Sequence, residues 1–244
     1  MEKKKRPAQE GADAVDINTQ VEEVKSETEK VEFTPVKPRG GKGYLFFKRL
    51  FDIISATLLF ILTSWIIAIC LLVKWLEDFS NPVYVSKRVG KDGKVFKFYK
   101  IRTMCPHAED LKQRLIDAGL NEADPPAFKM KDDPRITPVG KFLRKFSLDE
   151  LLQLLNVIGG SMSVVGPRPP LPSEVENYTE EQKQRLLVKG GLLCTWQIQK
   201  NRNSLSFDEW IKLDLDYIQN RSAGLDLKII FKGLFMVIFD HSGE

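Results

Sequence analysis

One stretch constrains this chain more than any other, the uncharged apolar run Ile53–Val73. As a helix it is long enough to cross the hydrocarbon core of a bilayer, which takes roughly 20 residues. Basic residues stand at both ends, with Lys48 and Arg49 before the run and Lys74 and Arg88 after it. An excess of positive charge on one side would give an orientation, but this symmetry gives none. The run therefore predicts either one spanning helix or a helix that enters the membrane and returns to the same face.

The composition places most of the chain among ordinary water-soluble domains. Of its 244 residues 43% are hydrophobic and 29% are charged, which suits one domain with a real core plus appendages. The net charge is +4, and residues 1–43 contribute nothing to it because they hold nine basic and nine acidic side chains. This mild positive bias is compatible with anionic lipid or nucleotides, but it is too small to predict nucleic-acid binding.

The chain divides into three predicted parts. Residues 1–43 are polar with scattered single apolar residues, so they cannot bury enough apolar surface to offset ordering entropy and are predicted to be a disordered tail. The basic start of this tail is not followed by an apolar segment, which excludes a signal peptide. Residues 44–80 form the membrane-inserted helix, and residues 81–244 form the remaining domain.

Cysteine and histidine usage excludes several kinds of site. Cys70, Cys105 and Cys194 have no CxxC spacing and leave an odd one, so neither a disulfide framework nor a zinc site is expected. With only His107 and His241 in the chain, histidine-based metal or triad chemistry is not expected either.

A β-hairpin is predicted after the apolar run. Asp92–Gly93 is a favoured two-residue turn, and the strand that follows it carries Phe96 and Phe98 on one side. Helices are predicted farther along, at Glu109–Leu120, Glu180–Leu187, Asp208–Asn220 and Leu225–Phe239.

The hairpin region is also strongly basic. Ser86–Met104 holds seven basic residues and one acidic residue, interleaved with aromatic and aliphatic ones. It can be a solvated edge strand that uses charge to avoid aggregation. It can also be a cationic strip near anionic headgroups and diphosphate, with Lys100 and Arg102 as the candidate contacts.

The chemistry-bearing stretch is Lys141–Pro170. It sets two adjacent carboxylates, Asp149 and Glu150, between Arg144 and Arg168. Carboxylates can hold a divalent cation and guanidinium groups bind phosphate oxygens bidentately, so this set suits a phosphorylated substrate. Prolines fix the loop around Arg168, which lowers the entropy cost of presenting its guanidinium, although a mere connector would look the same.

The acidic pair also has a purely structural interpretation. Ser147 and Glu150 have the spacing of a capping box, and acidic residues are favoured in a first helical turn. The two interpretations are compatible, because a helix N-terminus also keeps Asp149 ionised and offers N–H groups to phosphate. The helix predicted to follow would face the core with Leu148, Leu151, Leu152, Leu155 and Ile158 and end at Gly159–Gly160.

Five strings in this chain resemble one family in the family's own order, over about four fifths of the sequence. They are KRLFDI (Lys48–Ile53), RVGKDGKVFKFYKIRTM (Arg88–Met104), DDPRITPVGKFLRKFSLDELLQLLNV (Asp132–Val157), GPRP (Gly166–Pro169) and LDLDYIQNRS (Leu213–Ser222). The family is the monotopic phosphoglycosyl transferases, which are bacterial sugar transferases that act on polyprenol phosphate.

The resemblance implies an α+β fold: a mainly helical catalytic domain with a short β-hairpin. A re-entrant N-terminal membrane helix and interfacial amphipathic helices would anchor it on the cytoplasmic face of the bacterial inner membrane. Leu225–Phe239 either packs in the core or lies in that interface. The family's re-entrant helix bends at a Ser-Pro pair, whereas this chain has Ser64 followed by Trp65. Hydroxyls of Thr63 and Ser64 can bend a helix through bonds to its carbonyls, more weakly than proline does.

The resemblance also implies a reaction, in which a sugar-1-phosphate passes from a UDP-sugar to polyprenol phosphate to begin glycan assembly. Asp149 would be the nucleophile that carries the phosphosugar, and Glu150 would be a ligand of Mg²⁺. The implied partners are the UDP-sugar, polyprenol phosphate and membrane lipid, and a homo-oligomer is possible. The implied phosphate-binding residues are Lys100, Arg102, Arg144, Arg168 and Arg202.

Several departures from the family's pattern leave a second hypothesis open. Near Trp196 and Arg202, Gly190 replaces an expected proline and Cys194 an expected glycine. Ser161 and Leu152 are further departures, from an aspartate and a proline respectively. A membrane-tethered scaffold of glycan assembly that has lost catalysis would tolerate such changes, whereas it would have no need to keep the acidic pair with Arg144 and Arg168.

Overall fold

The computed structural model describes residues 35–120, 130, 132–199 and 204–239. The predicted tail therefore lies outside the described residues as far as residue 34, and so does most of the proline-rich segment after Leu120. The described end of the tail packs on the body. Val36 is buried, and the Arg39 amide donates to the Ile218 carbonyl at 3.0 Å.

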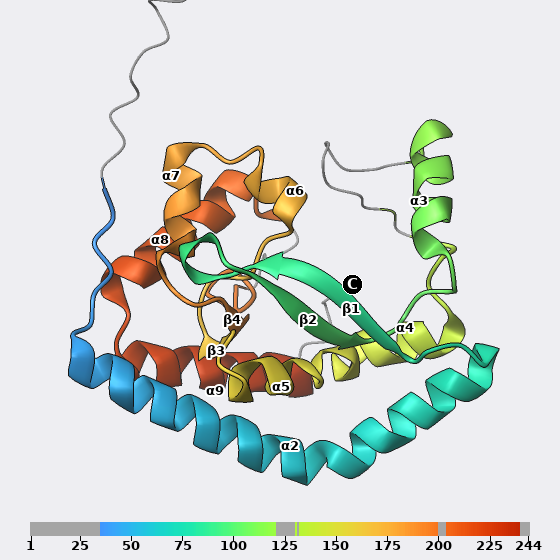
Figure 1. Cartoon of the computed structure of the whole chain (residues 1–244), viewed down its shortest axis with the longest axis horizontal. Coiled ribbons are helices and arrows are strands. Elements are labelled where there is room, and N and C mark those ends of the chain that lie inside the picture. The colour runs from blue at the N-terminus through green and yellow to red at the C-terminus, as the bar shows by residue number, and fades with distance from the viewer. Residues whose placement is uncertain (1–34, 121–129, 131, 200–203, 240–244) are drawn as a thin grey trace, which may run out of the picture. The chain divides into compact units, whose positions relative to one another are not determined.

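The apolar run forms the middle of one long helix, α2 (Lys42–Asp78), close to the predicted bounds. It is the only helix among the described residues that is long and apolar enough to cross a membrane. Figure 1 shows α2 bent near its middle, with both arms rising toward the same side. Thr63 Oγ1 donates to the Leu59 carbonyl at 2.7 Å and Ser64 Oγ to the Ile61 carbonyl at 2.8 Å. These are the hydroxyl-to-carbonyl bonds expected at a bend without proline.

A buried cation fixes the C-terminal end of α2 to the body. Lys74 has no exposed surface, and its Nζ binds Glu77 Oε2, Asp78 Oδ2 at 3.2 Å and Thr137 Oγ1 at 3.0 Å. Arg102, just after the second hairpin strand, binds both oxygens of Asp78, at 2.6 and 2.7 Å. We call these five side chains the α2 lock. They join the end of the apolar helix to two segments that lead to the acidic pair.

The hairpin forms as predicted. Strands β1 (Val83–Val89) and β2 (Val95–Ile101) pair antiparallel, with Val89 opposite Val95 and Val83 opposite Ile101. The turn η1 (Lys91–Gly93) holds Asp92 at φ 56° and Gly93 at φ 75°, a left-handed pair that Asp-Gly accommodates at low cost. Phe96 and Phe98 pack on each other on one side of the strand.

The remaining elements are short, apart from three exposed or C-terminal helices. They are α3 (Ala108–Asp117), α4 (Pro138–Lys145), η2 (Leu148–Glu150), α5 (Gln153–Ile158), β3 (Ser163–Val165), α6 (Pro172–Val175), α7 (Glu180–Lys183), η3 (Gln184–Leu187), β4 (Gly191–Leu193), α8 (Phe207–Asn220) and α9 (Ala223–Phe239). Strands β3 and β4 pair parallel, and a Cβ on Gly191 would stand 2.1 Å from the Gly166 amide nitrogen, so only glycine fits this crossing.

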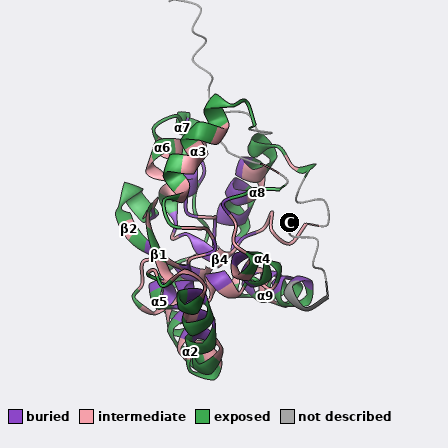
Figure 2. Cartoon of the chain, turned by 90° about the vertical axis from the view of Figure 1, so that its right-hand side faces the viewer, coloured by how far each residue is buried: buried purple, intermediate pink, exposed green. Residues whose placement is uncertain are grey.

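The core consists of three clusters of buried apolar side chains. One joins α8, α9 and β3 through Ile218, Ile229 and Val165, while the other two pack the inner side of α2 onto the hairpin, α4 and α5. Figure 2 shows the buried residues gathered in the interior and exposed ones along the outer side of α2. The predicted stripe of α5 was partly wrong. Leu155 is exposed, whereas Leu154 and Val157 enter the core, because the helix begins five residues later than predicted and its faces are rotated.

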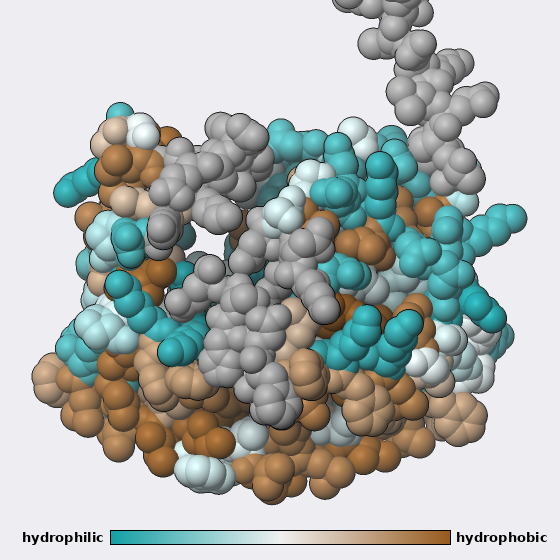
Figure 3. All heavy atoms as spheres, turned by 180° about the vertical axis from the view of Figure 1, so that it is seen from behind, coloured by the Kyte–Doolittle hydropathy of each residue, from teal (hydrophilic) through white to brown (hydrophobic). Residues whose placement is uncertain are grey.

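The outer sides of α2 and α9 leave many large apolar side chains in contact with solvent. Figure 3 shows a hydrophobic band along this side of the molecule. The band includes Leu58, Ile61, Leu62, Trp65, Ile69 and Leu72 of α2 and Leu227, Phe231, Leu234 and Phe235 of α9. Exposed apolar surface of this extent marks a site of membrane or protein contact.

Candidate active site

The acidic pair lies in the 3₁₀ turn η2, between α4 and α5. The predicted capping box is wrong, because Ser147 adopts φ 53°, a left-handed conformation, and its side chain accepts no cap hydrogen bond. Ser147 instead ends the preceding helix, with its amide donating to the Arg144 carbonyl at 2.9 Å. Helix α4 has the real N-cap, in which Thr137 Oγ1 accepts from the Gly140 amide.

Lys100 holds both carboxylates of the pair. Its Nζ lies 2.9 Å from Glu150 Oε1 and 3.4 Å from Asp149 Oδ2. The Asp149 side chain is 9% exposed and that of Glu150 25%. Asp149 therefore faces an almost closed site and Glu150 remains accessible. The sequence predicted Lys100 as a phosphate contact, and gave no sign that it would bridge the two acids.

The two carboxyl groups differ in their pKa. Burial raises the pKa of Asp149 above the ordinary aspartate value, and the charges of Lys100 and Arg144 only partly oppose this effect. Burial alone would raise the pKa of Glu150 too, but the charges of Lys100 and Arg168 hold it down at about 2. The acidic pair lies in a 3₁₀ turn, so the expected N-terminus of a long helix is not what acts on Asp149; Lys100 and Arg144 supply the charge that opposes the effect of burial.

Three arginines add to this charge. Arg144 acts on Asp149, and its Nε donates to Thr103 Oγ1 at 3.0 Å. Arg168 acts on Glu150, and its guanidinium lies 6.0 Å from the ring of Trp196. Arg88 had not been predicted as a site residue. Its Nη1 donates to the Pro169 carbonyl at 3.1 Å, and burial and the charge of Arg168 lower its pKa.

A buried ion pair supports the loop that carries Arg168. Arg185 donates to the Arg168 carbonyl at 3.2 Å, to Tyr178 Oη at 2.9 Å and to Asp214 by a short hydrogen bond. Arg185 and Asp214 are both almost fully buried. This support could not be predicted, because Asp214 lies 29 residues away along the chain. Nearby, Trp196 stacks on Trp210 with ring centroids 4.6 Å apart.

Two predicted phosphate contacts do not join this group in the described structure. Arg102 belongs to the α2 lock, where its guanidinium donates hydrogen bonds to both carboxylate oxygens of Asp78. Arg202 lies outside the described residues. The structure thus brings together Lys100, Arg144 and Arg168 around the acidic pair.

The described residues contain no group of three or more His, Cys, Asp or Glu side chains that could hold a metal. Mg²⁺ does not need one, since it commonly binds through one or two carboxylates, water and substrate phosphate oxygens. The accessible, ionised Glu150 fits this pattern. The arrangement can therefore present a buried carboxylate to a phosphorus atom and neutralise the phosphate oxygens around it.

Comparison with known proteins agrees with this chemistry. A family model described as bacterial sugar transferase matches residues 43–240. A galactosyl transferase, CpsE, of Streptococcus agalactiae is 43% identical over 196 residues, which cover 80% of this chain and 43% of that protein. An undecaprenyl-phosphate galactose phosphotransferase of Salmonella typhimurium is 39% identical over 195 residues, or 79% of this chain and 40% of its own length.

A shorter relative matches over most of its length. The exopolysaccharide production protein ExoY of Rhizobium meliloti is 38% identical over 199 residues, covering 81% of this chain and 86% of that protein. The chain thus spans about two fifths of the first two relatives and most of the third. The matches include both the apolar helix and the acidic pair, and the chain belongs to the bacterial sugar transferase family.

Proposed function

We propose that this protein transfers a sugar-1-phosphate from a UDP-sugar to polyprenol phosphate at the cytoplasmic membrane, as the first membrane step of a surface glycan. The observation that carries the proposal is the buried Asp149 beside Glu150, held by Lys100 and surrounded by arginines, on a body with an exposed apolar helix. The names of the relatives from Salmonella typhimurium and Rhizobium meliloti, an undecaprenyl-phosphate phosphotransferase and an exopolysaccharide production protein, support it.

In the first step, an oxygen of Asp149 attacks the sugar-proximal phosphorus of the UDP-sugar. The bond from that phosphorus to the bridging oxygen breaks, UMP leaves with the bond's electron pair, and the phosphosugar stays on the aspartate. Asp149 must be ionised to attack, and Lys100 favours the ionised form. Arg144 and Arg168 would bind phosphate oxygens bidentately and offset the repulsion between the anions, and their charges already act on Asp149 and Glu150.

In the second step, a phosphate oxygen of polyprenol phosphate attacks the phosphorus held by Asp149. The bond between aspartate and phosphorus breaks, which frees Asp149 and gives a polyprenol diphosphate sugar. Glu150 is the residue that would hold Mg²⁺ together with substrate oxygens, and the ion would supply charge neutralisation at the diphosphate. The apolar band of α2 and α9 supports delivery of the acceptor from the bilayer.

The covalent step is tested by mixing purified protein and UDP-sugar without any lipid acceptor. We expect a burst of about one UMP per active site, together with a phosphosugar-bearing peptide that contains Asp149. Asp149→Asn should abolish the burst, while Asp110→Asn, on the exposed helix α3, should keep it. UMP that forms only after polyprenol phosphate is added would instead indicate direct transfer between the substrates.

The metal is tested separately. Glu150→Gln should retain the fold and lose activity, since Glu150 makes no cap whose loss would unfold the turn. EDTA should abolish activity and Mg²⁺ should restore it. Activity that EDTA does not diminish would contradict the role of Glu150 as a metal ligand.

A further inference from the structure

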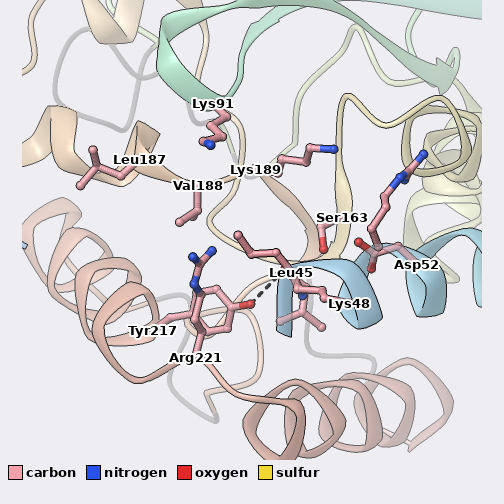
Figure 4. A pocket seen from close by; sticks show the side chains of 12 residues that line it. Leu45, Lys48, Asp52, Lys91, Ser163, Leu187, Val188, Lys189, Tyr217 and Arg221 are labelled. Carbon is pink, nitrogen blue, oxygen red and sulfur yellow. Dashed lines mark hydrogen bonds between the residues drawn. The ribbon is translucent and has the colours of Figure 1, made fainter. Parts of the chain in front are cut away.

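A cavity of about 220 Å³ lies beside the N-terminal arm of α2, apart from the acidic pair. Figure 4 shows side chains from α2, η1, β3, α8 and the segment before β4 lining it. Lys91 stands at the hairpin turn, whereas Lys100 lies toward the far end of β2. Lys100, which holds the acidic pair, lies five positions after Val95, the first residue of β2. Five positions along an extended strand are about 17 Å, so the hairpin turn beside the cavity is well apart from the acidic pair.

The lining carries an excess of positive charge. Its basic residues outnumber its single acid, Asp52; they are Lys48, Arg49, Lys91, Lys189 and Arg221. Two further acids reach these cations from outside the lining. Asp226 binds Lys48 at 2.9 Å, and Asp92 lies 3.8 Å from Lys91. Five cations against three carboxylates leave a surplus of two positive charges around an open space.

Two polar groups in the cavity have no partner. Ser163 is 2% exposed, and its Oγ makes no hydrogen bond to any residue that the structure describes. The Lys189 Nζ likewise forms no ion pair or hydrogen bond within the described ranges. Burial and the charges of Arg49 and Lys91 lower the pKa of Lys189, and the charge of Asp52 opposes them only in part. Figure 4 shows Ser163, Asp52 and Lys189 among the side chains that line the cavity.

A buried hydroxyl without a partner and a half-buried lysine crowded by cations both cost free energy while the cavity holds no anion. A phosphate group offers several acceptor oxygens and negative charge, so it satisfies both. The cavity is large enough for one such group but smaller than the usual pocket for a drug-sized ligand. Arg49 donates to the Val157 and Ile158 carbonyls, and these hydrogen bonds hold its positive charge in a fixed position beside the cavity.

The position along α2 indicates where the phosphate comes from. Leu45, Lys48 and Asp52 line the cavity, and the apolar run begins at the next residue, Ile53. The site therefore lies at the polar end of the segment that enters the bilayer, at the level of lipid headgroups. We propose that this cavity binds the phosphate of an anionic phospholipid headgroup, at a site separate from the acidic pair and independent of the proposed reaction.

The test uses the purified full chain in a neutral detergent. The probes are inorganic phosphate, a short-chain phosphatidylglycerol and a phosphatidylcholine with the same acyl chains, each titrated while thermal unfolding is followed. Phosphatidylglycerol should raise the unfolding midpoint most. Phosphatidylcholine should raise it little, because its choline would face the cations. Inorganic phosphate should act weakly, because it lacks the acyl chains.

Variants of Lys189 and Ser163 assign the effect to the cavity. Lys189→Gln should weaken phosphatidylglycerol binding about tenfold, as expected for one charged hydrogen bond, and Lys189→Arg should largely keep it. Ser163→Ala should weaken binding without lowering stability in the absence of lipid, because its hydroxyl has no partner to lose. Lys94→Gln is the control. Lys94 follows the hairpin turn that contains Lys91, and it does not line the cavity.

Equal phosphatidylglycerol binding by the wild type and Lys189→Gln would overturn the proposal. A response to inorganic phosphate with none to phosphatidylglycerol would overturn the lipid assignment. The UMP burst tests the proposed reaction by itself, so failure of one does not imply failure of the other.

Discussion

At the scale of single residues, one lysine controls the electrostatics of the site. Lys100 contacts both carboxylates, so its charge favours the ionised form of Asp149 and opposes the effect of burial, which raises the pKa of that carboxyl. Asp149 and Glu150 are adjacent in sequence, yet their pKa values shift in opposite directions because they differ in burial and neighbours. This difference in pKa fits the two roles proposed above, in which Asp149 is the buried nucleophile and Glu150 the more accessible metal ligand.

Lys100→Met should move the acid limb of the pH–activity profile to higher pH. The protonated form of Asp149 cannot attack, and its pKa is already raised by burial, so activity falls as the pH drops through that raised value. Removal of the neighbouring cation raises the pKa further and shifts the limb upward. The measurement is the rate of UMP release between about pH 4 and pH 9, a range that lies above the ordinary aspartate pKa and so can follow the raised pKa of Asp149.

Lys97→Met is the matched control for this experiment. Lys97 lies on the same strand, three positions before Lys100, and is exposed. Its profile should follow the wild type. An acid limb that stays in place in Lys100→Met would show that Lys100 does not set the ionisation of Asp149.

At the scale of elements, local patterns predicted the hairpin but not the turn at the acidic pair. The Asp-Gly turn and the alternating strand predicted β1 and β2 because the turn chemistry acts within a few residues. The string from Ser147 to Glu150 has the same spacing as a true capping box. Nothing in it reveals that α4 ends there and takes Ser147 as its left-handed terminal residue. Ser147 could either end α4 or begin the next helix, and the packing of α4 in the folded protein favours the first.

Ser147→Gly should stabilise the protein by about 0.5–1 kcal/mol, because glycine adopts a left-handed conformation without the steric cost that a Cβ imposes. A serine in a capping box would respond in the opposite direction. Ser206 provides the comparison, since its Oγ accepts from the Glu209 amide in the capping box of α8. Ser206→Ala should cost about 1 kcal/mol. Denaturant titration in detergent measures both values, and a destabilised Ser147→Gly would contradict the assignment.

The bend of α2 gives a second prediction at this scale. Trp65→Pro should be tolerated, because the helix already curves in this region and the Ile61 carbonyl, the i−4 group for residue 65, has the Ser64 hydroxyl as a partner. Ile69→Pro, four residues along the same helix, should cost about 3 kcal/mol or more where the helix runs straight. Folded yield and thermal midpoint in detergent measure the difference. Equal losses in both variants would place the bend elsewhere.

At the scale of the whole molecule, the sequence predicted several local features but not the distant contacts that support them. The apolar run, the hairpin and the acidic pair could be found from periodicity and motif, because each is encoded over short stretches. The bridge from Lys100 to the pair, the carbonyl contact between Arg185 and Arg168, and the α2 lock join segments far apart in sequence. Such contacts follow from the fold as a whole, so the order of residues does not reveal them.

The bent form of α2 predicts that both of its ends stay on one side of the membrane. Single cysteines at Gly41 and at Glu109, both exposed, report on the two sides of the helix once Cys70, Cys105 and Cys194 are replaced. In intact bacterial cells an impermeant thiol reagent should label neither position, and both should react after the cells are permeabilised. Labelling of Gly41→Cys alone would show that α2 spans the bilayer.

The α2 lock has a mechanical consequence. Glu77 and Asp78, which bind the buried Lys74, are still partly exposed, and moving their carboxylates from water into hydrocarbon would be costly. We therefore expect the α2 lock to limit how deeply α2 can enter a bilayer. Arg102 connects the α2 lock to strand β2, which carries Lys100 two residues earlier in the chain. In the proposed transferase, we therefore expect the chain itself to set the height of Asp149 above the lipid, so that an acceptor phosphate at the membrane surface meets this carboxylate at a fixed level.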